Sequence, residues 1–184
     1  MMVWVAEFRS SLEREFGDHP RVAALATVDE SDHPRARSVV CRQVEDDGTT
    51  WYTSDARSAK NRQLSREPRA EAVFWLPMLL EQYRISGRVD IIRPGDAEDV
   101  RTHAWDTLSS ASRALFLWPD PGAPLDPDAG RFPAKISAGY DPPDTFELLV
   151  LVPTRAERLA LGEHPHLRVR YSAEGHWAPE TLNP

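Results

Sequence analysis

The chain has 184 residues, a formal net charge of −7 at pH 7 and a pI near 5.4. This length suits one domain with its own core, and we treat residues 1–184 as a single domain. The acidic balance, without a block of consecutive Lys or Arg, argues against a nucleic-acid-binding or membrane surface. No apolar run approaches the ~20 residues of a spanning helix. Cys41 is the only cysteine, which excludes an intramolecular disulfide and favours a cytoplasmic location.

The chain opens with a predicted helix and a predicted buried strand. Apolar side chains recur at helical spacing over residues 3–16, and Gly17 ends the pattern. Residues 21–28 form a compact apolar run that is typical of a strand. We expect the helix to lie across a sheet that contains this strand.

The next stretch predicts a β-hairpin. Residues 35–44 are rich in β-branched side chains, Asp47-Gly48 is a hairpin-turn signal, and residues 49–53 supply the returning strand. The period of two places Arg37 and Arg42 on opposite faces of the first strand, unless a β-bulge intervenes.

Polar residues concentrate where the returning strand meets the next helix. Ser58 is a natural N-cap, residues 59–65 suit a helix, and Pro68 ends it. A helix N-terminus offers unpaired N–H groups and the positive end of a dipole, so the addition of Arg57, Ser58 and Lys60 predicts a phosphate site. The alternative is an ordinary capped helix start with a solvated Lys60, because caps and surface cations are common there.

Two further predicted strands, residues 69–75 and 81–91, form a hairpin with one polar face. In the second strand Tyr83 faces the core, whereas Gln82 and Arg84 face the other way. Such a polar face usually meets only solvent, but its position after the candidate phosphate site makes it a second candidate for ligand contacts.

The remaining chain combines helices, a proline-rich stretch and more strands. Residues 94–105 and 109–117 predict helices, and residues 118–143 hold seven prolines, which predict a loop without regular elements. Further strands are predicted at residues 146–152, 155–161, 167–171 and 176–177. Hairpins with inserted helices favour an antiparallel closed barrel of the α+β class, mainly β.

Several kinds of site lack support. His164 and His166 flank a proline without a third ligand at a recognisable spacing, so we expect no metal. No phosphate-binding GxxxxGK[ST] loop, no GxGxxG fingerprint and no serine elbow is present.

Taken together, the hairpin, the helix start and the polar strand resemble the FMN-binding pattern of the pyridoxamine 5′-phosphate oxidase-related split-barrel flavoproteins. The resemblance is carried by residues 37–42, Tyr52-Thr53, residues 57–60 and Glu81-Gln82 before Ser86-Gly87, and the C-terminal segment is also similar. It implies a six-stranded antiparallel split barrel, a homodimer with FMN at the subunit interface, and an oxidoreductase that acts on a small molecule. The residues that the resemblance assigns to FMN are Arg37, Arg42, Tyr52, Thr53, Arg57, Ser58, Lys60, Gln82 and Arg168.

The resemblance also implies roles. Arg37 and Arg42 would flank the flavin, Tyr52 and Thr53 would touch its ring and ribityl chain, Ser58 and Lys60 would hold the phosphate, and Gln82 would bond the ring.

Departures from the oxidase pattern lie on the substrate side. Arg42 stands where the oxidase has a lysine, Leu159 where it has a tryptophan, and residues 164–167 where it has an arginine-rich motif; only Arg168 matches there. The pattern therefore predicts retained FMN binding and poor activity on pyridoxine or pyridoxamine 5′-phosphate. It names no catalytic acid or base, and it leaves open a non-catalytic protein that binds flavin for storage or sensing.

Overall fold

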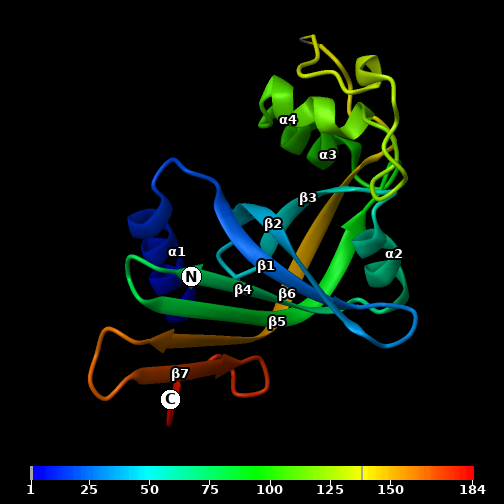
Figure 1. Cartoon of the computed structure of the whole chain (residues 1–184). Coiled ribbons are helices and arrows are strands. Elements are labelled where there is room, and N and C mark those ends of the chain that lie inside the picture. The colour runs from blue at the N-terminus through cyan, green and yellow to red at the C-terminus, as the bar shows by residue number, and fades with distance from the viewer. Residues whose placement is uncertain (1, 138) are drawn as a thin grey trace.

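The computed structural model describes residues 2–137 and 139–184, and its centre is an antiparallel β-barrel (Figure 1). Six strands follow one another in the order β3-β2-β1-β4-β5-β6, and pairing of β3 with β6 closes the ring. β7 and β8 extend the sheet beyond β6. The strands are β1 (Arg21–Val28), β2 (Pro34–Val44), β3 (Thr50–Asp55), β4 (Arg69–Leu76), β5 (Glu81–Ile92), β6 (Phe146–Ala160), β7 (Leu167–Ser172) and β8 (Glu180–Leu182).

The described residues also form four α-helices and two short 3₁₀ turns. These are α1 (Val3–Phe16), α2 (Ala59–Arg66), α3 (Glu98–Asp106), α4 (Ser110–Ala114), η1 (Leu115–Leu117) and η2 (Ala129–Arg131). In Figure 1, α3, α4 and the segment after them lie together at one end of the molecule, and β7 with the C-terminus lies at the other. The predicted barrel and the expected helices are confirmed.

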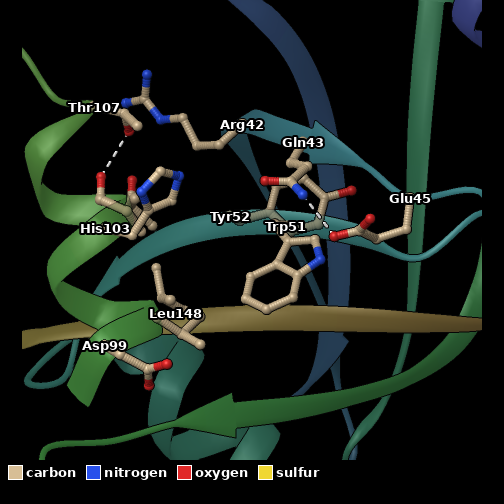
Figure 2. A pocket seen from close by; sticks show the side chains of 12 residues that line it. Arg42, Gln43, Glu45, Trp51, Tyr52, Asp99, His103, Thr107 and Leu148 are labelled. Carbon is tan, nitrogen blue, oxygen red and sulfur yellow. Dashed lines mark hydrogen bonds between the residues drawn. The ribbon is translucent and has the colours of Figure 1, made fainter. Parts of the chain in front are cut away.

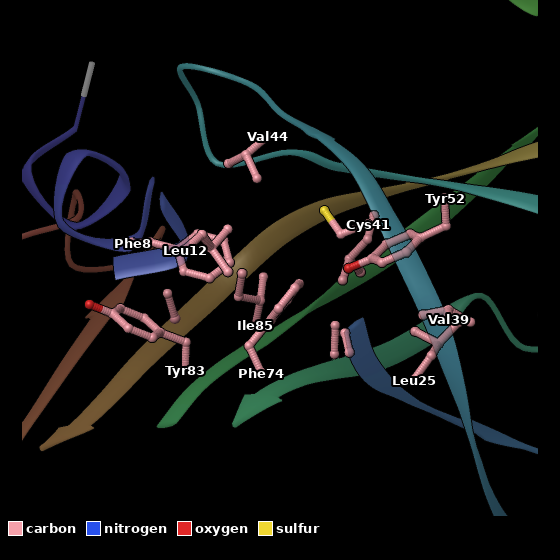
Figure 3. Packing of buried hydrophobic residues seen from close by; sticks show 14 of the residues in the cluster. Phe8, Leu12, Leu25, Val39, Cys41, Val44, Tyr52, Phe74, Tyr83 and Ile85 are labelled. Carbon is pink, nitrogen blue, oxygen red and sulfur yellow. The ribbon is translucent and has the colours of Figure 1, made fainter. Parts of the chain in front are cut away.

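Most of the apolar core fills the barrel beneath α1. Phe8 of α1 packs edge-on against Phe74 of β4, with ring centroids 4.9 Å apart, and the same ring contacts Tyr83 of β5. The expected alternation along β5 is confirmed. Tyr83 and Ile85 are buried in this core (Figure 3). Gln82 and Arg84 lie on the other face of the strand and are only half-buried.

A smaller core joins the α3–α4 end to the barrel. Trp105, Phe116 and Phe146 meet edge-on with centroids 4.9 to 5.8 Å apart, and Leu108 and Leu148 complete the cluster. This packing holds α3, α4 and η1 against the first half of β6.

The C-terminal third differs from the sequence prediction in three ways. Residues 146–152 and 155–161 are parts of one 15-residue strand, β6, because a register shift opposite Ser86 and Gly87 accommodates Pro153 without ending the strand. Residues 176–177 have positive φ angles in a turn, and the last strand is β8 instead. The proline-rich residues 118–143 do contain one regular turn, η2.

Candidate functional site

Three adjoining cavities form a groove along the outside of β2 and β3, and all three are lined by Arg42 and Thr53. Their volumes are about 680, 360 and 260 Å³. The first lies between β3 and α3, the second between β3 and the α4 end, and the third along β2. Figure 2 shows Arg42 extending toward the side of α3 that carries His103 and Thr107, with Trp51 and Leu148 on the barrel side. We call this surface the flank groove.

Arg42 lies at a β-bulge beside the flank groove. The register of β2 against β3 shifts between Cys41 and Gln43, so Cys41 and Val44 enter the core while Arg42 and Gln43 are both exposed. The β-bulge that the sequence analysis allowed for in this strand is therefore present. Burial raises the pKa of the Cys41 thiol to about 12, which keeps this side chain protonated and inert.

Lys60 enters the flank groove from the first turn of α2. Its ammonium is half-buried rather than solvated, and it donates to Ser58 Oγ over 3.0 Å. Burial lowers the pKa of Lys60; the nearby carboxylate of Asp55 opposes this shift, and the charge of Arg37 adds to it. Among the described residues, no carboxylate forms an ion pair with Lys60 or Arg42. Asp55 lines the same cavity, but its carboxylate is paired with Arg57. The charges of Lys60 and Arg42 therefore favour an anion as ligand.

Arg37 lies near this site but its guanidinium already has partners. It donates to Leu25 O over 3.0 Å, to Thr27 Oγ1 over 2.6 Å and to Gln63 Oε1 over 2.8 Å. All three acceptors are neutral, so the positive charge of Arg37 is not cancelled. The sequence analysis did not single out Gln63. Its position on the buried side of α2, where a polar residue needs a partner, is the signal that could have indicated it.

The strand–helix junction is held mainly by its own contacts. Arg57 pairs with Asp55, with Nη2 2.7 Å from Oδ2, and with Asp120, with Nη1 3.0 Å from Oδ1. Ser58 is buried and its hydroxyl donates to Asn61 Oδ1 over 3.1 Å. Asn61, also missed in the sequence, links Ser54 of β3 to Glu147 of β6. This network fixes α2 against the barrel and so sets the position of Lys60.

The two residues of the Tyr52-Thr53 pair point in opposite directions. Tyr52 is only 1% exposed and its ring lies in the barrel core beside Cys41 and Val39 (Figure 3), with its hydroxyl 2.9 Å from Thr50 Oγ1. Burial raises the pKa of Tyr52. The side chain of Thr53, on the opposite face of β3, is the one that can reach a ligand in the flank groove.

Gln82 and Arg168 lie together at a second place, on the outer face of β5, β6 and β7. Gln82 pairs with Leu159, Leu159 pairs with Arg168, and these side chains line a small cavity of about 70 Å³. The cavities of the flank groove include neither Gln82 nor Arg168. The structure therefore divides the predicted site residues into two sets.

One carboxylate organises this outer face. Glu157 is only 5% exposed, and its Oε2 accepts from Arg168 Nη2 over 2.7 Å and from Arg84 Nη2 over 3.0 Å. Arg155 lies 3.5 Å from the other oxygen. These arginines hold the pKa of Glu157 below its usual range despite the opposing effect of burial.

The described residues provide neither a cluster of metal ligands nor a membrane-spanning helix. No cluster of three or more His, Cys, Asp or Glu side chains suited to a metal ion occurs among them. None of their helices has the length and hydropathy needed to cross a bilayer.

Comparison with known proteins identifies the family. Residues 1–93 match the family model described as pyridoxamine 5′-phosphate oxidase, FMN-binding domain. The chain belongs to this family. It is 28% identical over 175 residues to pyridoxine/pyridoxamine 5′-phosphate oxidase 2 of Arabidopsis thaliana, which covers 90% of this chain and 88% of that protein.

Solved structures agree with this assignment. A pyridoxamine 5′-phosphate oxidase-related, FMN binding protein from Nostoc punctiforme superposes with a TM-score of 0.91 and 31% identity, over 100% of this chain and 99% of its own. PhzG from Burkholderia lata, solved with tetrahydrophenazine-1-carboxylic acid, gives a TM-score of 0.78 at 21% identity, over 98% and 89% of the two chains. The second likeness concerns the fold alone.

The family model describes an FMN-binding domain, so the cofactor is FMN. The residues of the flank groove fit this group. The half-buried Lys60 and the exposed Arg42 supply positive charge, the carboxylate of Asp55 in the same cavity is taken up by Arg57, and Thr53 adds a hydroxyl to the lining.

Proposed function

We propose that this protein is an FMN-dependent oxidoreductase that acts on a small organic molecule. The observation that carries the proposal is the pair of cations, Arg42 and Lys60, that line the flank groove without a carboxylate partner among the described residues. When bound, FMN supplies hydride and electron transfer, and the protein supplies binding, orientation and electrostatics.

Each groove residue has a definite task in this proposal. Lys60 would neutralise the phosphate, and a bound anion would offset the burial that disfavours its charged form in the free protein. Arg42, raised out of the strand register by the bulge, reaches both the cofactor end and the cavity beside α3. Arg37 adds positive potential while Gln63 and Thr27 keep it in place.

The division of site residues into two sets supports a homodimer. One chain presents Arg42 and Lys60 in the flank groove and Gln82 with Arg168 on its outer face, and these sets line different cavities. A second copy with its outer face against the groove would bring both sets to one flavin. Light scattering should then give twice 20.8 kDa for the flavin-loaded protein. A flavin-loaded monomer would contradict this assembly.

The cavity of about 680 Å³ beside α3 is the proposed substrate pocket. Trp51, Leu148 and Val100 give it an apolar side, and Arg42 is the only arginine among its lining residues. A phosphorylated substrate needs a cationic clamp of its own in addition to the one that holds FMN. We therefore expect pyridoxine and pyridoxamine 5′-phosphate to be poor substrates, as measured by formation of pyridoxal 5′-phosphate.

The test of the proposed function begins with the absorption spectrum of the purified protein and the mass of the molecule that heat releases. FMN should bind at least ~10-fold more tightly than riboflavin, because a charge-assisted contact contributes roughly 1.5 to 3 kcal/mol. Reduction of the bound flavin by NADH or NADPH, followed by reoxidation, would support an enzyme. A flavin that binds but is not reduced by either nucleotide or by candidate amine and alcohol donors would favour a storage or sensing protein.

A further inference from the structure

One side of the flank groove is formed by a segment that lies beyond the family-matched residues 1–93. The cavity of about 360 Å³ has the barrel on one side, with Arg42, Thr53 and Lys60. Its other side is α4, η1 and the first residues of the proline-rich segment, which contribute Ser112, Leu115, Phe116, Trp118 and Pro121. We call residues 110–121 the retaining wall.

Apolar groups of the retaining wall face the cavity. Leu115 is 49% exposed, whereas the adjacent Phe116 is 9% exposed and packs against Trp105 and Phe146. The wall is thus anchored by Phe116 while Leu115 remains available to a ligand. Covering half of a leucine side chain with an organic ligand removes apolar surface from water and favours binding.

Polar contacts fix the retaining wall at both sides. Asp120 Oδ1 lies 3.0 Å from Arg57 Nη1 at the strand–helix junction, and Arg57 is independently held by Asp55. Trp118 Nε1 donates to Pro133 O over 3.0 Å, and Thr145 Oγ1 donates to Phe116 O over 2.7 Å. The wall is therefore tied to the same junction that positions Lys60.

We propose that the retaining wall is part of the cofactor site and that it contacts bound FMN through Leu115 and Trp118. This inference rests on the proposed function, because it assigns FMN to the flank groove. The Arg57–Asp120 ion pair holds the wall closed along the groove. The consequence is kinetic: the wall slows the release of FMN.

The main experiment measures the rate of FMN release from the loaded, full-length protein by the recovery of free-flavin fluorescence. Leu115→Ala should release FMN about 3- to 10-fold faster, as expected when roughly half of a leucine side chain loses its ligand contact. The matched control is Leu125→Ala, which changes a leucine of the same region that is 85% exposed and lines none of the three cavities of the flank groove. The control should release FMN at the wild-type rate.

A second pair of variants tests the ion pair. Asp120→Asn should release FMN about 2- to 5-fold faster, because exposed ion pairs are weak. Asp126→Asn is the control, since Asp126 pairs with Arg131 within the proline-rich segment, with Nη1 2.7 Å from Oδ2. Slower release from Asp120→Asn would overturn the inference, because it would mean that Arg57 prefers the phosphate and that Asp120 competes with the cofactor.

Failure of this inference and failure of the proposed function give different results. If the wild-type protein binds FMN and both Leu115→Ala and Asp120→Asn release it at the wild-type rate, the wall has no part in retention and only this inference falls. If the wild-type protein binds no FMN, both fall.

Discussion

The flank groove and the outer face of β5–β7 both gather cationic side chains, but they differ in how the charge is balanced. Arg42 and Lys60 meet in the groove without a carboxylate partner among the described residues. Arg84 and Arg168 share the buried carboxylate of Glu157 at 3.0 and 2.7 Å. Charges that are balanced within the protein hold side chains in place, whereas charges that are not balanced can bind a ligand of opposite sign.

The contrast predicts that removing one charge affects a different property at each place. In the flank groove it should weaken ligand binding and leave folding unchanged. On the outer face it should weaken folding, because the arginines lose the anion that holds them together.

The largest effect is expected for Lys60→Ala in the flank groove. FMN should bind about 10- to 100-fold more weakly, equivalent to about 1.4 to 2.8 kcal/mol, while riboflavin binding hardly changes. The melting temperature of the apo protein should stay nearly constant, since alanine favours a helix and the half-buried ammonium gains no ion pair from a described residue. Flavin fluorescence titrations and a thermal melt measure these quantities.

The control for Lys60→Ala is Arg62→Ala on the same helix. Arg62 is exposed and donates to Arg57 O, and it lines none of the three groove cavities. Equal losses of FMN affinity in the two variants would reduce the effect to general positive charge on α2.

Glu157→Gln on the outer face should lower the free energy of unfolding by about 1 to 2 kcal/mol, because one neutral amide cannot replace a carboxylate shared by several guanidinium groups. The partial exposure of Arg84 and Arg168 keeps the loss below that of a fully buried pair. Chemical denaturation of the apo protein measures this change in the free energy of unfolding.

The control is Glu180→Gln, which removes an exposed carboxylate paired with Arg170 and should cost less than about 0.5 kcal/mol. Equal costs for the two variants would remove the special role of Glu157.

The smallest expected effect is a pH dependence of FMN binding. The pKa of Lys60 is lowered from 10.5, so the free protein loses this charge as pH rises through the lowered value. Bound phosphate favours the charged form, and the ratio of FMN affinity to riboflavin affinity should therefore fall as pH rises from neutrality through the lowered pKa of Lys60. The unfolded chain holds the Lys60 proton longer than the folded apo protein, so this group adds stability as pH rises in the same window. A ratio that falls equally in Lys60→Ala would assign the titration to another group.

The sequence predicted most elements because local signals and burial agree in them. Both α1 and β1 begin and end where their apolar patterns do. The prediction failed where tertiary pairing overrides a local signal: Pro153 indicates a break, yet a register shift opposite Gly87 lets β6 continue. The end of the chain failed for a similar reason, since pairing with β7 decides which residues form β8.

The candidate site was predictable in its members but not in its arrangement. Residue type and spacing indicated Lys60 and Arg42, but only the structure shows that Arg42 lies in a bulge and that Tyr52 turns its ring into the core. Gln63 lies 26 positions from Arg37, and Glu157 lies 73 positions from Arg84, so no local pattern could have paired them.

The closure of the barrel by β3 and β6 has a consequence for how the chain folds. Thr50 pairs with Leu151, about a hundred residues later, so the ring stays open until the last third of the chain has been synthesised. Until then β3 and β5 each present an edge to which another chain could add. Residues 1–93, which match the family model, include neither β6 nor the helices α3 and α4 that pack against the first half of β6. Folding of the nascent protein therefore depends on late, long-range pairing. We expect its slowest step to be the pairing of β6 with the free edges of β3 and β5.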